Sequence, residues 1–172
     1  LDNKAYMHAG MKFDELFASE PYDSRDKDPG SDVPRYQFGI VNRFEDFCSL
    51  QQAKEEEASL SRMTAGFAWK WETKTNKDAF DIVIEGIRKR WNSTQKDWVN
   101  SANAVNEVGC IHTVQGYDLN YGFVILGPDI YYDYDKGAVC INKANFKDAV
   151  AKKKASDDDL RKIIVNAYYV LM

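Results

Sequence analysis

Two almost wholly apolar segments enclose a short polar turn between residues 109 and 129, which read GCIHTVQGYDLNYGFVILGPD. The segments on either side, VGCIHTV and FVILGPDI, have the composition of buried strands. In open α/β sheets, ligands gather beyond the carboxyl ends of the strands, which is where this turn would lie. The polar turn therefore indicates either a ligand-facing loop, with His112, Thr113, Gln115 and Gly116 as its candidate residues, or polar groups that only stabilise the turn itself.

Strand-like and helix-like segments alternate along the rest of the chain. The predicted strands are residues 35–41, 61–69, 79–87, 108–114 and 123–130, with a hairpin at 131–142 that turns at Asp135, Lys136 and Gly137. The segment 70–78 is predicted to be a polar connection, and 92–107 to be weakly amphipathic or irregular. A helix through 87–91 is the alternative to strand 79–87. This alternation favours an α/β fold with a largely parallel sheet and an antiparallel hairpin at one edge.

Three helices are predicted, at residues 5–17, at residues 43–60 and after Ser156, and a short helix at 117–121 is predicted to follow the polar turn. Asn42 is the predicted N-cap of the second, with Glu45 at the capping-box position. Ser156 is the predicted N-cap of the third, because three aspartates follow it where the helix dipole favours negative charge. The core-facing residues predicted for this third helix are Leu160, Ile163, Ile164, Ala167 and Leu171. Residues 18–34 are rich in Pro, Gly, Ser and Asp and are predicted to form a mobile loop.

The length and net charge of the chain narrow the kinds of protein that it can be. The chain has 172 residues, which suits one domain, and its net charge of −4 is not that of a globally basic nucleic-acid binder. Local basic strips remain, in IRKRW and in AKKKA. The three cysteines have no zinc-ligand or disulfide spacing, so we expect a reducing, cytoplasmic setting. No apolar run is long enough to predict a membrane span.

The sequence is also compatible with other kinds of functional site. Cys110 and His112 would share one face of a strand and form a thiol–imidazole pair, although a buried structural cysteine explains Cys110 more simply. The acidic group Asp129, Asp133 and Asp135 would suit either a cation or a turn. The four tryptophans would stack on bases or pack in the core. The chain contains no GxxxxGK[ST] sequence, so it is not a complete P-loop ATPase by itself.

The residues GCIHTVQGYDLNYGFVILGPDI resemble motif V of superfamily-one helicases, which reads Thr-x-His-x-x-Gln/Lys-Gly-x-Glu before a hydrophobic strand. The chain is more similar to an uncharacterised P-loop ATPase family, the Schlafen-type DNA/RNA helicase domain. That similarity extends over most of the chain, including MTAGFAWKWE, DIVIEGIRKRWN and SDDDLRKIIVNAYYVL. It implies that residues 1–172 are one three-layer RecA-like domain, with a mainly parallel sheet flanked by helices. This domain would be the second motor domain of a nucleic-acid-dependent ATPase.

The resemblance also implies roles for individual residues. Gln115 and Gly116 match the motif's Gln-Gly pair at the ATP cleft. Asp118 matches the acidic residue that contacts the nucleotide ribose, but its side chain is one methylene shorter than the usual Glu. His112 matches the helicase histidine, which approaches the nucleic acid or couples it to the nucleotide. Cys110 stands where helicases often have a phosphate-binding Thr. The residues assigned to nucleic-acid binding or coupling are His112, Thr113, Arg88, Arg90 and Trp91.

In this family, NAYYVLM would be followed by a Thr-Arg-Gly that supplies an arginine finger. The Walker A and B motifs would belong to a first RecA-like domain of the same parent chain, so ATP and Mg²⁺ are expected only in the full-length protein. The expected partners are that first domain and DNA or RNA, with no membrane. The isolated chain is predicted neither to hydrolyse ATP nor to unwind nucleic acid. Two alternatives remain: a non-catalytic nucleic-acid or protein interaction module that uses the basic strip and Trp91, and, more remotely, a hydrolase built on Cys110 and His112.

Overall fold

The structure, a computed structural model, describes residues 39–172, and the elements below belong to its unit Arg43–Met172. The helix predicted at 5–17, the loop predicted at 18–34 and most of the strand predicted at 35–41 lie outside the described residues. The described end of that strand, residues 39–41, is not in a strand.

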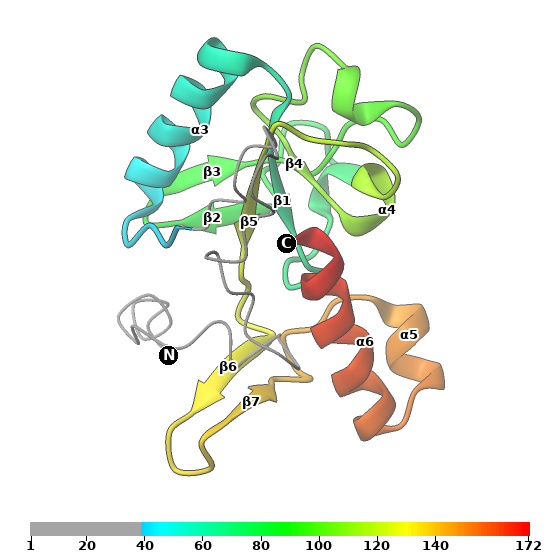
Figure 1. Cartoon of the computed structure of the whole chain (residues 1–172). Helices are drawn as coiled ribbons and strands as arrows, with labels where there is room; N and C mark the ends of the chain where they lie inside the picture. Colours follow the sequence, from blue (N-terminus) through cyan, green and yellow to red (C-terminus); the bar gives the residue numbers. More distant parts are fainter. Residues whose placement is uncertain (1–38) are drawn as a thin grey trace. The chain divides into compact units, whose positions relative to one another are not determined.

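A parallel sheet forms the centre of the unit (Figure 1). Its strands are β1 (Ser61–Ala65), β4 (Val108–Gly109) and β5 (Tyr121–Ile125), in the order β4-β1-β5. Met63 lies beside Val108 on one neighbour and beside Phe123 on the other. Every residue of β1 is buried, which is expected of a central parallel strand covered on both faces.

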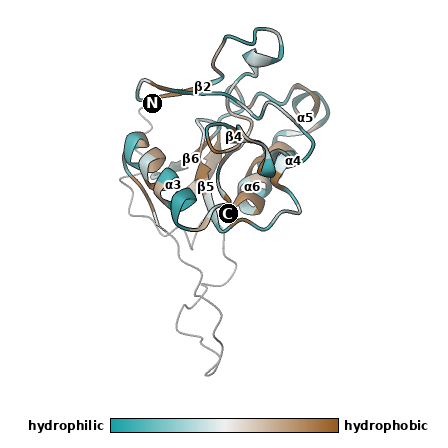
Figure 2. Ribbon diagram, turned by 90° about the horizontal axis from the view of Figure 1, so that it is seen from above, coloured by the Kyte–Doolittle hydropathy of each residue, from teal (hydrophilic) through white to brown (hydrophobic). Residues whose placement is uncertain are grey.

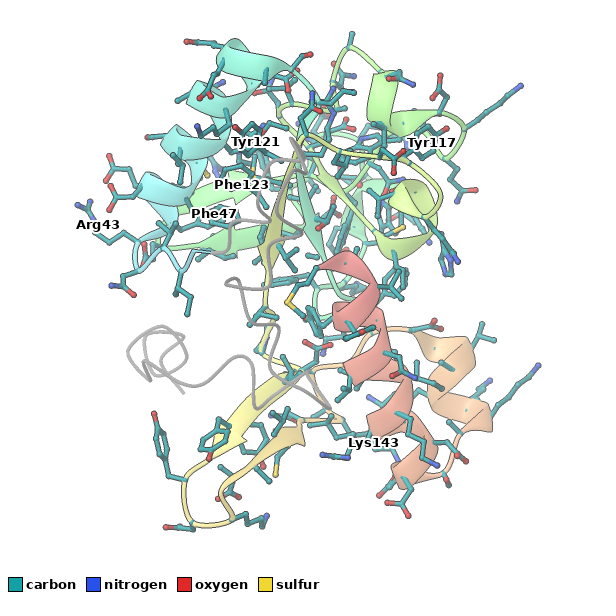
Figure 3. The ribbon with its side chains drawn as sticks, in the orientation of Figure 1. Arg43, Phe47, Tyr117, Tyr121, Phe123 and Lys143 are labelled. Carbon is teal, nitrogen blue, oxygen red and sulfur yellow. The ribbon has the colours of Figure 1, made fainter. Side chains whose placement is uncertain are left out.

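Helices cover both faces of this sheet. On one side lies α3 (Phe44–Ala58), and on the other lie α4 (Ile111–Val114) and α6 (Asp157–Leu171), as two perpendicular views show (Figures 1 and 2). The α3 side holds the main core, where the ring of Phe47 meets that of Phe123 edge-on with centroids 5.2 Å apart (Figure 3). The fold is therefore α/β with a parallel sheet between helices, as predicted, and it is compatible with a RecA-like domain.

Two antiparallel hairpins accompany the sheet. Strands β2 (Ile82–Ile84) and β3 (Ile87–Lys89) are joined by Glu85 and Gly86, which both have positive φ, 51° and 83°. Such a pair of residues is typical of a tight type I′ turn. The prediction of one strand at 79–87, and its helical alternative at 87–91, are both replaced by this hairpin. Strands β6 (Ile130–Asp133) and β7 (Ala138–Ile141) form the second hairpin, which confirms the turn predicted at 135–137.

The start of α3 differs from the prediction. Its N-cap is Arg43 rather than Asn42, and Arg43 makes no side-chain capping bond. The carboxylate of Glu85, in the β2–β3 turn, instead accepts a hydrogen bond of 2.8 Å from the Phe44 amide. Glu45 forms an ion pair with Arg43 rather than a capping box. A capping group 41 residues away cannot be found from local sequence spacing.

The C-terminal helix α6 begins as predicted. Ser156 is its N-cap and accepts a hydrogen bond from the Asp159 amide. Its buried residues are Leu160, Ile164, Tyr168 and Leu171, whereas Ile163 is 40% exposed. The predicted core stripe was therefore wrong at Ile163 and omitted Tyr168. The short helix before it, α5 (Ala149–Lys154), is capped by Asp148 and was not predicted.

The two connecting segments contain little regular structure, as predicted. Residues 70–78 include only the turn η1 (Glu72–Lys74), and residues 92–107 include only η2 (Trp98–Asn100). None of the helices between residues 39 and 172 has the length and apolar content needed to cross a membrane.

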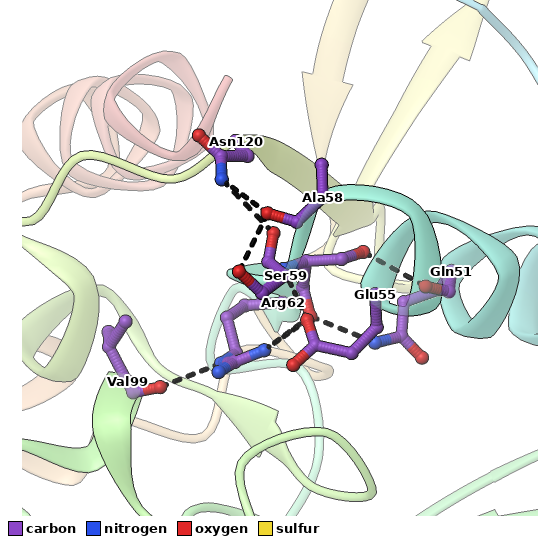
Figure 4. A network of polar contacts seen from close by, with 8 residues as sticks. Gln51, Glu55, Ala58, Ser59, Arg62, Val99 and Asn120 are labelled. Atoms are coloured by element: carbon purple, nitrogen blue, oxygen red, sulfur yellow. Dashed lines mark hydrogen bonds and ion pairs between the residues drawn. The ribbon is translucent and has the colours of Figure 1, made fainter.

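A buried polar network fixes α3 against the start of β1 (Figure 4). The guanidinium of Arg62 pairs with Glu55 at 2.7 Å and donates to the Val99 carbonyl at 2.8 Å. Because Arg62 is 5% exposed, its charge requires these partners. At the same end, Asn120 donates to the Ala58 carbonyl at 2.8 Å, which holds the start of β5 beside the end of α3.

Candidate functional site

The carboxyl ends of β1, β4 and β5 lie along one edge of the sheet, because the three strands are parallel. Three connections leave this edge: residues 66–69 after β1, residues 110–120 after β4 and residues 126–129 after β5. In α/β sheets this edge is where ligands bind. The connection after β4 contains most of the residues singled out from the sequence.

The predicted strand VGCIHTV is in fact a two-residue strand followed by a turn of helix, α4. Cys110 remains extended, with φ −88° and ψ 166°, and the chain turns immediately after it. The carbonyl of Cys110 accepts hydrogen bonds from the Thr113 amide at 3.0 Å and from the Thr113 hydroxyl at 2.8 Å. Such a local side-chain bond favours a turn over a strand. The prediction treated β-branched residues as strand formers and missed this competing bond.

The candidate residues differ in their exposure to solvent. His112, Gln115, Gly116 and Asp118 are exposed, whereas Thr113 is buried. The imidazole of His112 packs beside Phe67, from the connection after β1, with ring centroids 5.9 Å apart. Gln115 ends α4, and Gly116 follows with φ +87° and open space around it. The helix predicted at 117–121 is absent: residues 117–119 are irregular and β5 begins at Tyr121.

The open connection is anchored at Tyr117 and at Asn120. The hydroxyl of Tyr117 donates to Asp97 at 3.0 Å, which raises the pKa of Tyr117. Asp97 has a positive φ of 52°, a conformation that non-glycine residues rarely adopt. At its end, Asn120 holds the chain against α3 (Figure 4). Gln115 and Gly116 therefore lie between the end of α4 and the anchor at Tyr117, which Figure 3 labels, and Asp118 lies between the anchors at Tyr117 and Asn120.

The proposed thiol–imidazole pair does not form. Cys110 is 3% exposed and His112 is exposed in the second position of α4, so the two do not share a strand face. The sulfur of Cys110 instead lies 3.9 Å from the hydroxyl of Thr113. A buried structural cysteine is the better description, and the hydrolase alternative loses its geometric basis.

The connection after β5 is closed by the C-terminal helix. The hydroxyl of Tyr168 donates to the Asp129 carboxylate at 2.7 Å and accepts from the Gly127 amide at 2.9 Å. Tyr168 and Asp129 are 0% and 1% exposed. Burial raises the pKa of Asp129 to about 6, and burial beside this carboxylate raises the pKa of Tyr168 well above its usual value. The sequence analysis missed this contact, because Asp129 was assigned to a turn or a cation and Tyr168 was omitted from the core.

Two glycines make this closure sterically feasible. A Cβ on Gly66 would lie 2.5 Å from the Tyr168 ring, and one on Gly127 would lie 2.3 Å from the Cβ of Ala68. Both distances are far below van der Waals contact, so neither position accepts a side chain unless the neighbouring atoms move. Tyr168 thus links the connections after β1 and β5 into one packed unit.

The basic strip IRKRW is split between surface and core. Arg88 and Arg90 are exposed on β3 and just after it, whereas Trp91 is 1% exposed and packs in the main core. Trp91 therefore has no free face for a base. Trp98 is also fully buried, and Trp69 and Trp71 are partly buried.

The acidic residues after β5 do not converge on a cation. Asp129 is bound to Tyr168, while the carboxylate of Asp133 accepts from the amides of Asp135 and Lys136 and pairs with the Lys136 ammonium. Within residues 39–172, no group of three or more His, Cys, Asp or Glu side chains is arranged to hold a metal ion. The turn explanation therefore accounts for Asp133 and Asp135.

Comparison with known proteins places this geometry in a family. The family model described as "Schlafen group 3, DNA/RNA helicase domain" matches residues 13–172. The chain belongs to this helicase-domain family. One relative, the uncharacterized protein YPL245W of Saccharomyces cerevisiae (strain ATCC 204508 / S288c), is 32% identical over 105 residues. This match covers 56% of the chain and 23% of the yeast protein. No solved structure matches the chain.

Proposed function

We propose that this helicase-like domain acts as the second motor domain of a nucleic-acid-dependent ATPase. In this proposal, the loop Gln115–Asp118 faces a nucleotide held mainly by a first motor domain of the same parent protein. The observation that carries the proposal is the exposed loop Gln115–Asp118 at the carboxyl edge of a parallel sheet. Membership of the helicase-domain family supports the same assignment.

Each exposed residue of the loop offers suitable chemistry. The Gln115 amide provides both a donor and an acceptor, and the missing side chain of Gly116 lets a ligand approach the backbone. The Asp118 carboxylate accepts hydrogen bonds from ribose hydroxyls, with a shorter reach than a glutamate would have. ATP and Mg²⁺ enter only with the first motor domain, and the metal there would neutralise charge on the phosphates.

His112 and Thr113 act differently in this proposal. His112 is exposed at the start of α4 and packs against Phe67, so it touches two of the three connections at the ligand edge. This position suits coupling between nucleic acid and the nucleotide loop. Thr113 is buried and holds the carbonyl of Cys110, so it acts as a positioning residue that sets the start of α4. Movement of this edge against the first motor domain would couple ATP turnover to remodelling of nucleic acid.

The test is ATPase turnover of the parent protein with single-stranded nucleic acid present. Gln115→Ala is expected to lower kcat at least about tenfold, which corresponds to about 1.4 kcal/mol of lost transition-state stabilisation. Gln52→Ala, at an exposed position of α3, is the matched control and should leave kcat unchanged. Unchanged turnover in Gln115→Ala would remove this residue from the mechanism. A parent protein without any ATPase activity would contradict the motor role itself.

A further inference from the structure

The β2–β3 hairpin presents two arginines on one face. Side chains alternate along a strand, so Arg88 and Arg90 project to the same side while Lys89 projects to the other. Lys89 is partly buried, and its charge partly offsets the burial that raises the pKa of Cys48 in α3. The exposed positive charge of the strip IRKRW is therefore confined to Arg88 and Arg90.

The base of this hairpin is rigidly held. The Asp81 carboxylate accepts from the Trp91 amide at 2.8 Å and from the amide and hydroxyl of Thr73, each at 2.8 Å. Trp91 itself is buried in the main core. The two arginines therefore extend from a fixed backbone, and binding at their guanidinium groups would not require the strand to become ordered.

The guanidinium groups are themselves pre-positioned. Their central carbons lie 4.7 Å and 4.6 Å from the ring centroid of Phe80, for Arg88 and Arg90 respectively. The Nε of Arg90 also donates to the Ala79 carbonyl at 3.0 Å. Among residues 39–172, Arg43 and Arg62 form ion pairs, but no carboxylate pairs with Arg88 or Arg90. Two ordered cations without a counter-charge are suited to an anionic ligand.

Apolar surface lies beside these cations. Phe80 is 36% exposed, and Val83, which pairs with Arg88 across the hairpin, is 55% exposed. Residues two apart on a strand are about 6.6 Å apart, comparable to the spacing of neighbouring phosphates along an extended nucleic-acid strand. Bases stack on aromatic rings and on guanidinium planes alike. An acidic peptide would satisfy the two cations but would leave Phe80 and Val83 without a matching partner.

We propose that Phe80, Arg88 and Arg90 form a binding site for single-stranded nucleic acid, with phosphates on the arginines and a base stacked on the cluster that Phe80 forms with the two guanidinium groups. The site needs neither ATP nor the first motor domain. It therefore goes beyond the motor role, and its failure would leave that role intact. It also replaces Trp91 with Phe80 as the aromatic residue of the basic strip.

The test is fluorescence anisotropy of a labelled single-stranded oligonucleotide titrated with the 172-residue chain between about 50 and 200 mM salt. The double variant Arg88→Gln/Arg90→Gln should weaken binding. It should also reduce the slope of log Kd against log salt by about 1.4, because each phosphate contact contributes about 0.7 for a single strand. Lys153→Gln/Lys154→Gln removes the same charge from the exposed end of α5 and should leave the slope unchanged.

A third variant separates the contribution of base stacking to binding from that of the two arginine charges. Phe80→Ala should raise Kd at least about fivefold while changing the salt slope little, since stacking contributes about 1 kcal/mol or more per base. Circular dichroism of each variant checks that the fold is retained. Three results would overturn the proposal: no binding at low salt, equal losses in the two double variants, or competition by a polyglutamate peptide as effective as that by unlabelled oligonucleotide.

Discussion

The connections that follow β4 and β5 leave the same edge of the sheet but are built in opposite ways. After β4, Gln115, Gly116 and Asp118 are exposed on a loop that is held at Tyr117 and at Asn120. After β5, Gly127 and Asp129 are sealed by the buried hydroxyl of Tyr168. The first connection leaves its polar groups available to a ligand, whereas the second uses them to hold helix α6.

This difference indicates which of the two polar loops has a structural role. Asp129 has an environment that perturbs its pKa strongly, a feature often found at functional sites. Yet its carboxylate accepts a hydrogen bond from the buried hydroxyl of Tyr168, and Asp129 is 1% exposed, so its chemistry serves packing. In the exposed loop, the pKa of Tyr117 is raised, chiefly by its hydrogen bond to Asp97. The exposure of polar groups to a partner therefore distinguishes the two loops better than a shifted pKa does.

The largest effect is expected for Gly127→Ala. The new Cβ would lie 2.3 Å from the Cβ of Ala68, so the closed connection must open or shift. We expect the free energy of unfolding, measured by urea denaturation, to fall by about 3 kcal/mol or more. Gly122→Ala, in β5, is the control because no atom lies within 4 Å of its added Cβ, and it should change stability by less than about 0.5 kcal/mol. Equal stability of the two variants would show that the connection is not tightly closed.

A pH-dependent effect is expected from Asp129. Its pKa in the folded protein is about 6, above the ordinary value of 3.8, so the folded state binds this proton more tightly than the unfolded state. The free energy of unfolding should therefore fall as the pH rises from about 4 to 6, by about 2 to 3 kcal/mol from this group. Urea denaturation over this range, compared between the native chain and Asp129→Asn, isolates the contribution. Parallel pH profiles for the two proteins would contradict the assignment.

A smaller effect is expected in the open loop. Gly116 has φ +87°, which disfavours any side chain, but its surroundings are open. Gly116→Ala should therefore lower the free energy of unfolding by only about 1 kcal/mol. Gly116→Asn should cost less, since Asn tolerates positive φ better than Ala. A loss as large as that of Gly127→Ala would mean that the loop after β4 is also tightly packed.

Local sequence patterns predicted those elements whose determinants are local. The Ser156 cap, the 135–137 turn and the existence of the apolar strands β1 and β5 follow from neighbouring residues, and the structure confirms them. The strand bounds differ, since β1 ends at Ala65 rather than at residue 69 and β5 spans Tyr121–Ile125 rather than 123–130. Long-range determinants were missed: Glu85 caps α3 from 41 residues away, and Tyr168 binds Asp129 across 39 residues. The polar turn was located correctly, but α4 was not predicted, because the bonds of Thr113 to Cys110 outweigh its preference for a strand.

Hydrogen exchange in the parent protein, with and without a non-hydrolysable ATP analogue, compares the two connections most directly. If the loop after β4 faces the nucleotide, the backbone amides of 115–118 should become protected on binding. The amides of Gly127 and Asp129 should exchange slowly in both states, because Tyr168 already seals this connection. Protection gained at 127–129, with none at 115–118, would contradict the assignment of the open loop to the nucleotide cleft.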